Sequence, residues 1–279
     1  MSKYTPLFIT AGLGLGAYLF YQEYLKATSQ TSTNFKPQKP PTTDPNAPAD
    51  PQLLRRSMQV LEIYSKNFME SPNITNSLRH IIKLYTSEIL KSKTLAQKLL
   101  ADGIIDKRFS LLAQSKNPLL LIDIYGLLTN FLCTVTGDLP ALIIIRQEKL
   151  VEVGVQKGLQ GSENESSSSD SSENSGVQNA CLVFLKNLTV RDDILDLDIG
   201  IEILDEIMKM YAKFDTDNKV HATSVINNAL RSDIVGGKNL REAFSKKWNH
   251  WFEHLSAESE NIESEKLATN LRYLEKIAN

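Results

Sequence analysis

The sequence predicts an all-α protein whose helices form repeats behind an N-terminal membrane anchor. From Leu54 onward apolar residues recur at helical spacing, one helical pattern returns about every 42 residues, and an apolar uncharged segment opens the chain. The 279 residues are 42% hydrophobic and 23% charged, an ordinary globular composition that can bury a core. The formal net charge of −2 argues against a general nucleic-acid binder, which would carry a basic excess.

The predicted anchor covers residues 1–26. Residues 4–22 form a run of 19 without a charge, which as a helix would span roughly 28 Å, enough for a thin bilayer. A cleaved signal peptide is the alternative, but only Lys3 precedes the run and no Ala-x-Ala site follows it. The spacing of Gly12 and Gly16 suits close packing of two anchors in a homodimer; otherwise these small residues only tune hydrophobicity.

A proline-rich tether is predicted to follow at residues 27–53. It holds six of the ten prolines among polar residues, a composition that cannot bury a core. More basic residues follow the uncharged run 4–22 (Lys26, Lys36 and Lys39) than precede it, so we expect the C-terminal part in the cytosol. A short, moderately apolar anchor with this basic flank resembles the signal-anchors of the mitochondrial outer membrane. The endoplasmic reticulum and the peroxisome are the alternatives.

The repeat is marked by an asparagine within each of four longer helices. The positions three before, two before and one after it are apolar, which makes one helical stripe. The spacings are 57, 41 and 42 residues, and the first is longer by the 15 polar residues of segment 162–176. A second pattern ends at Gly103 and again at Gly154, where we predict turns into the next helix. The four asparagines are Asn130, Asn187, Asn228 and Asn270.

By repeat length, by the glycine before the second helix and by the asparagine on the third, residues 54–279 resemble the armadillo family. The resemblance implies a right-handed α-solenoid of about four to five repeats; the related HEAT repeats are the alternative. Stacked repeats would share one continuous core. In armadillo proteins the third helices line a concave groove, where the asparagines bind the backbone of an extended partner peptide. The alternative is that each of these amides caps or bridges neighbouring helices.

The resemblance does not extend to nuclear-import receptors. These carry a tryptophan four residues before the asparagine, where this chain has Gly126, Val183, Ser224 and Lys266. A receptor for nuclear-localisation signals is therefore not expected.

Two further segments are candidates for regulation or binding. The acidic, serine-rich insertion 162–176 is predicted to be disordered, and Ser162 and Ser167 each precede an acid by three residues, as substrates of acid-directed kinases do. The alternative is an insertion tolerated in a surface loop. Trp248 and Trp251 share one helical face, which predicts a C-terminal core or cap, with a partner hot spot as the alternative.

The sequence offers no convincing catalytic or metal-binding constellation. His250 and His254 lack a third zinc ligand, and Cys133 and Cys181 fall within helices, where core thiols are expected. There is no Walker loop, no Gly-x-Ser-x-Gly elbow and no His-Glu-x-x-His. We therefore expect neither enzyme activity nor a cofactor.

The expected function follows from the resemblance. The chain is similar to N-terminally anchored armadillo proteins of the mitochondrial outer membrane, which implies a cytosol-facing scaffold that binds protein partners in mitochondrial organisation or dynamics. One alternative is an armadillo-like nucleotide exchange factor for a seventy-kilodalton heat-shock chaperone. Another is a structural subunit of a membrane complex.

Overall fold

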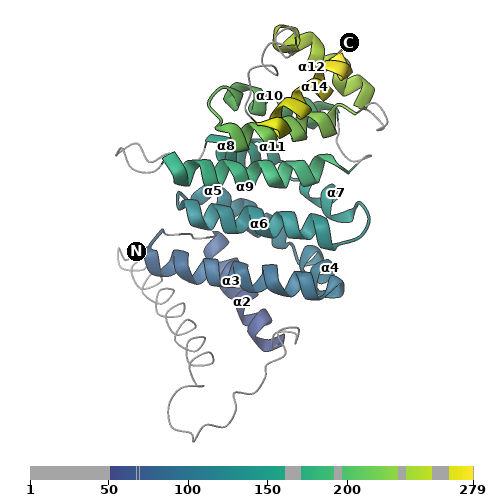
Figure 1. Ribbon diagram of the computed structural model, residues 1–279. Helices are drawn as coiled ribbons and strands as arrows, with labels where there is room; N and C mark the ends of the chain where they lie inside the picture. The colour runs from purple at the N-terminus through teal and green to yellow at the C-terminus, as the bar shows by residue number, and fades with distance from the viewer. Residues whose placement is uncertain are drawn as a thin grey trace, which may run out of the picture.

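The computed structural model describes residues 51–66, 68, 70–160, 171–191, 197–231, 237–252 and 264–278. Every regular element in these ranges is a helix (Figure 1), which confirms the all-α prediction for the described part of the chain. In chain order the helices are α2 (Pro51–Lys66), α3 (Pro72–Lys91), α4 (Lys93–Ala101), α5 (Ile104–Gln114), α6 (Pro118–Thr134), α7 (Leu139–Ile145), the π-helix η1 (Leu150–Gln156), α8 (Lys157–Gln160), α9 (Ser171–Thr189), α10 (Leu197–Tyr211), α11 (Thr216–Ala229), α12 (Gly237–Phe252) and α14 (Glu265–Ala278).

The helices stack in two layers. In one layer α3, α6, α9, α11 and α14 each pack against the next (Figure 1). In the other, α2 packs on α5, α5 on η1, η1 on α10 and α10 on α12. Each helix therefore meets mainly its neighbours in the stack, as in an α-solenoid, and one apolar core runs between the layers.

Polar side chains fix where several helices begin. Ser71, Ser92, Asn117 and Asp215 each accept a hydrogen bond from the backbone N–H three residues later, and so satisfy a donor that the helix leaves open. Gly103 joins α4 to α5 in the left-handed conformation, with φ of 73°. The turn predicted at Gly103 is confirmed.

The turn predicted at Gly154 is wrong. This glycine lies inside the π-helix η1, and the left-handed glycines in the described ranges are elsewhere. Its role is steric, because a Cβ there would lie 2.5 Å from the Phe109 ring. The sequence pattern detected a required glycine but assigned it the wrong cause.

Two predicted boundaries shift in the structure. Helix α2 begins at Pro51, three residues before the predicted start, since proline suits the first helical position. Helix α9 begins at Ser171 and so takes in the last six residues of segment 162–176. There Ser175 donates to the Asp215 carboxylate and its carbonyl accepts from the Asn218 amide at 3.3 Å, so contacts with α11 hold this turn as helix.

The predicted anchor, with Gly12 and Gly16, lies outside the described residues, and so do residues 27–50 of the predicted tether. Among the helices that the structure does describe, none combines the length and apolar character needed to span a bilayer.

Candidate binding surfaces

The four predicted asparagines lie on four successive helices of one layer. Asn130 is on α6, Asn187 on α9, Asn228 on α11 and Asn270 on α14. All four side chains are partly exposed, and each of their helices packs against the next (Figure 1). We call these four residues the asparagine ladder. The sequence spacing thus places them at equivalent positions along the stack.

Three members of the ladder use their amide groups within the protein. The Asn228 amide donates to the Lys186 carbonyl on α9 at 3.3 Å. The Asn270 amide donates to the Val220 carbonyl on α11 at 3.2 Å. Asn187 instead donates to the Val183 carbonyl one turn back in its own helix, at 2.8 Å. The bridging role left open by the sequence therefore applies to Asn228 and Asn270.

Asn130 differs from the other three. Its side chain makes no hydrogen bond to any residue in the described ranges, although it is only partly exposed. The nearby Cys133 thiol donates instead to the Asn187 amide oxygen on the next helix, at 3.5 Å. An unbonded amide can both donate and accept. Asn130 is thus the member most open to a partner's backbone.

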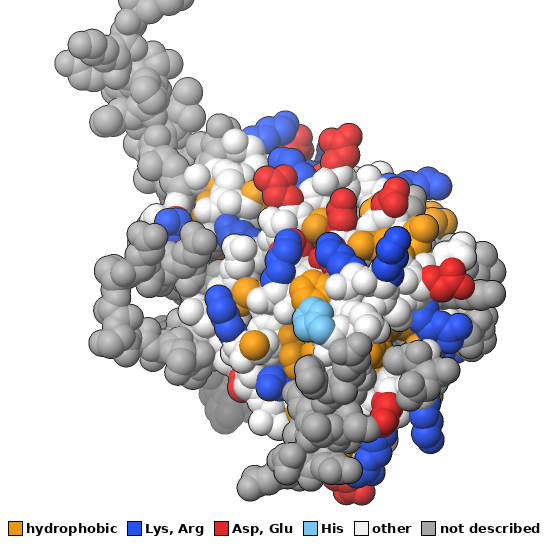
Figure 2. All heavy atoms as spheres, turned by 90° about the horizontal axis from the view of Figure 1, so that it is seen from above, with side chains coloured by type: hydrophobic (Ala, Val, Ile, Leu, Met, Phe, Trp, Pro, Cys, Tyr) orange, Lys and Arg blue, Asp and Glu red, His pale blue; other side chains and the backbone are white. Residues whose placement is uncertain are grey.

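Basic side chains accompany the ladder on α9, α11 and α14. Burial lowers the pKa of His221, and the positive charges of Lys186 and Lys266 lower it further, against a smaller opposite effect of Asp217. The two lysines are therefore close enough to His221 to affect it electrostatically. From above the stack (Figure 2), basic and acidic side chains of the described residues are interspersed with apolar patches.

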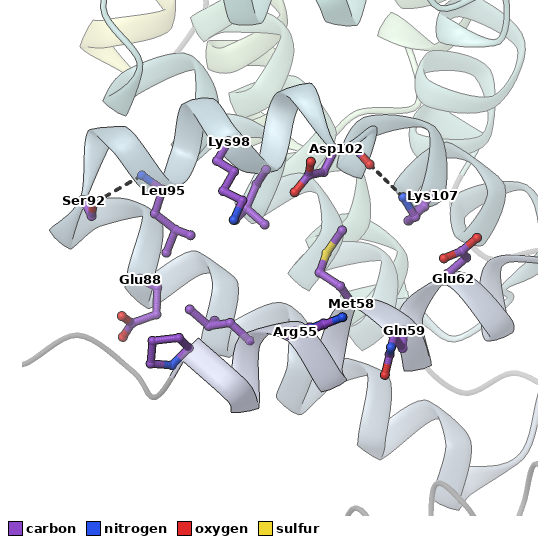
Figure 3. Close-up of a pocket in the computed structure, with 13 residues that line it drawn as sticks. Arg55, Met58, Gln59, Glu62, Glu88, Ser92, Leu95, Lys98, Asp102 and Lys107 are labelled. Carbon is purple, nitrogen blue, oxygen red and sulfur yellow. Dashed lines mark hydrogen bonds between the residues drawn. The ribbon is translucent and has the colours of Figure 1, made fainter.

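A groove lies between α2 and α4, at the N-terminal end of the stack (Figure 3). Leu54 and Met58 of α2 face Leu95 and Leu99 of α4 across a volume of about 720 Å³. Figure 3 shows Met58 pointing up from α2 while Leu95 and Lys98 point down from α4. We call this space the α2–α4 groove. Its remaining lining residues are Pro51, Arg55, Gln59, Glu62, Glu88, Ser92, Asp102 and Lys107.

The two tryptophans pack α12 against α10. The Trp248 indole donates to the Asp205 carboxylate at 2.8 Å, and Lys247 pairs with the other oxygen of that carboxylate. The Trp251 ring meets Tyr211 edge-on, with centroids 5.4 Å apart. Both tryptophans are only partly exposed. The geometry is that of a C-terminal core; a hot-spot role for Trp248 and Trp251 stays a prediction.

Arg108 of α5 is fully buried, and none of its guanidinium nitrogens has a hydrogen-bond partner among the described residues. Its charge lies over the Tyr85 ring, 5.6 Å from the centroid. Burial lowers the pKa of Arg108 to about 9. The Tyr85 hydroxyl donates to the Leu54 carbonyl at 3.0 Å, which ties α2 to α3.

The remaining candidates give no further site. Ser162 and Ser167 lie outside the described residues. No group of three or more His, Cys, Asp or Glu within the described part of the chain is placed to hold a metal ion. Cys181 is buried, and burial raises the pKa of its thiol to about 12, so it is no nucleophile at neutral pH.

Sequence reasoning missed the α2–α4 groove and the buried Arg108. The groove had a signal, since Leu54, Met58 and Glu62 recur at helical spacing, but that pattern reads equally as a core-facing stripe. Arg108 had none, because a lone arginine in a helical pattern is ordinarily exposed.

Comparison of the chain with protein-family models, with curated proteins and with solved structures finds no significant match in any of the three.

Proposed function

We propose that this chain is a membrane-tethered, armadillo-like scaffold of about four to five right-handed repeats, which binds an extended segment of a partner protein along the asparagine ladder. The observation that carries the proposal is the recurrence of one residue type at one position on α6, α9, α11 and α14. The armadillo resemblance of the sequence supplies the binding mode. Enzyme activity forms no part of the proposal.

The hydrogen-bonding state of the ladder supports this mode. Asn130 is free to donate and accept, as far as the described residues go. The amide oxygens of Asn228 and Asn270 accept no hydrogen bond within the described ranges, although their nitrogens are used. A peptide backbone offers both N–H and C=O groups, so it can pair with such amides whatever its side chains.

We further propose that residues 1–26 anchor the chain in the mitochondrial outer membrane, with the helical domain in the cytosol. The support is the uncharged segment 4–22 and the basic residues that follow it. The tether would allow the domain to search the space near the membrane, where partners on the same membrane are present at high effective concentration.

The ladder is tested by proximity labelling in cells that express the full chain. Wild type is compared with the double variant Asn130→Ala and Asn228→Ala, with Asn239→Ala as the matched control. Asn239 is exposed on α12, a helix of the other layer. We expect the double variant to lose a subset of labelled proteins that the control keeps. Recovery of the same proteins by all three chains would contradict ladder binding.

The location is tested by protease digestion of intact organelles from cells that express the chain with a C-terminal tag. A protease-sensitive tag on mitochondria is the expected result. A protected, processed chain in microsomes would contradict the cytosolic scaffold. It would favour the alternative of a nucleotide exchange factor for a seventy-kilodalton heat-shock chaperone, acting in the lumen of the endoplasmic reticulum.

A further inference from the structure

The α2–α4 groove has the dimensions and lining of a binding site for one more helix. Along α2 it runs from Pro51 to Glu62, which is about 17 Å of helix. Two apolar side chains line each wall. Figure 3 shows Lys98 and Asp102 pointing from α4 toward α2, so charged groups also face the space between the walls. A groove of this kind receives the apolar face of a helix.

Helices α2 and α3 form the first set at this end of the stack, and α4, α5 and α6 form the next set. Comparison of the two sets shows which helix is missing beside the groove. The short helix α4 packs against α3, α5 and α6, and so covers one side of the set that α5 and α6 form. The first set has α2 and α3, but no described helix precedes α2 in the same role. The apolar walls formed by Leu54, Met58 and Leu95 are consequently left partly exposed.

The chain upstream of the groove contains an occupant of the right kind. Fifty residues precede Pro51, which itself lines the groove. The apolar segment 4–22 is joined to it by the 28 residues 23–50, whose reach at about 3.1 Å per residue is roughly 85 Å. That reach exceeds the groove length several times, so the segment can lie along it in either direction. A linker of this kind gives an effective concentration in the millimolar range.

We propose that residues 4–22 dock as a helix in the α2–α4 groove whenever the chain is away from a membrane. This inference rests on the proposed anchor, since it gives the same segment a second seat. The segment cannot lie in the bilayer and in the groove at once, so membrane insertion empties the groove. Docking shields apolar surface that would otherwise face water during transit to the membrane.

The test uses the full chain with Cys133→Ser, because the exposed Cys133 would react with the cross-linker. Cys181 is buried and is retained. Ala11→Cys in the segment is combined with Met58→Cys in the groove, or with Thr269→Cys, exposed on α14 at the far end, as control. A bis-maleimide cross-linker is added with and without phosphatidylcholine vesicles. We expect an intramolecular cross-link to position 58 that vesicles abolish, and none to position 269.

Any other result overturns either the proposed docking or the proposed anchor. Absence of the cross-link to position 58, or equal cross-linking to position 269, overturns docking. A cross-link between two chains shows that a second copy fills the groove and also overturns it. If the cross-link persists with vesicles and the chain does not float with them, docking stands and the proposed anchor fails.

A second measurement needs no cysteines. The double variant Met58→Glu and Leu95→Glu places charges on both groove walls. If the segment is docked about 90% of the time, freeing it raises the apparent affinity for vesicles about tenfold in flotation. The control Ile63→Glu changes an exposed apolar side chain of α2 outside the groove and should leave flotation unchanged. Equal flotation of wild type and both variants, with helical circular dichroism retained, would rule out docking.

Discussion

The middle of the stack and its C-terminal end are held together in different ways. In the middle, where α6, α8, α9 and η1 meet, the contacts are steric and close. A Cβ at Gly158 would lie 2.3 Å from the Tyr125 hydroxyl oxygen and 2.6 Å from the Cys181 sulfur. At the C-terminal end, amide bridges join α11 to α14: Asn227 donates to the Asn270 carbonyl at 3.2 Å, and the Asn270 amide donates back.

The difference shows that one architecture can rest on two kinds of interface. Close packing leaves no room for added atoms, even where a neighbour is polar, as the Tyr125 hydroxyl that donates to the Gly154 carbonyl is. Bridged helices tolerate small changes of volume but lose stability when a polar partner is removed. The same asparagine position therefore has different consequences at Asn130 and at Asn270.

The largest expected effect is that of added volume in the middle. Gly158→Ala should destabilise the folded state by about 3 kcal/mol, because its Cβ would collide with the side chains of both Tyr125 and Cys181. Gly126→Ala is the matched control, since a Cβ there meets nothing within 4 Å and alanine favours the helix by up to about 1 kcal/mol. Urea unfolding followed by circular dichroism measures both. Equal stability of the two variants would show that the middle is loosely packed.

The next largest effect concerns Arg108, which is buried in the interior next to the middle of the stack. Arg108→Met should stabilise the fold by about 2 kcal/mol at neutral pH, because it removes a buried charge without a hydrogen bond among the described residues. Arg108 has a folded pKa of about 9, below its ordinary value of 12.5, so the unfolded chain binds more protons between these values. Wild-type stability should therefore rise through that window relative to the variant. A variant less stable than wild type at pH 7 would contradict this account.

The third effect compares two members of the ladder directly. Asn270→Ala should cost about 1 to 2 kcal/mol, because its amide donates to Val220, Thr223 and Ser224 on α11. Asn130→Ala should change stability by no more than about 0.5 kcal/mol, since no described residue bonds to its side chain. Thermal unfolding of both variants gives the comparison. Similar losses would mean that the ladder is uniformly structural.

The smallest effect concerns the bridge from α12 to α10. Trp248→Phe keeps an aromatic ring but removes the indole donor to Asp205, whose carboxylate retains Lys247. We expect a loss of about 1 kcal/mol in urea unfolding. No loss would show that Lys247 alone satisfies the Asp205 carboxylate.

Much of the fold was predictable from local pattern. Helical periodicity gave the helices, and the 42-residue spacing placed Asn187, Asn228 and Asn270 on neighbouring helices of one layer. Which carbonyl each asparagine amide donates to was not predictable. Asn187 bonds within its own helix while Asn228 reaches across to α9, and nothing in their matching flanks distinguishes them. That choice depends on the distance and rotation between packed helices.

The sequence by itself determined the helical class, the Gly103 turn and the alignment of the ladder, because these depend on periodicity and on residue types that act locally. Only the tertiary structure decided that Gly154 and Gly158 are needed for close approach, that Arg108 is buried without a bond among the described residues, and that α2 and α4 leave a groove between them. Each of these is a relation between surfaces far apart in sequence. Such relations arise when helices pack, and the local pattern of the amino-acid sequence does not contain them.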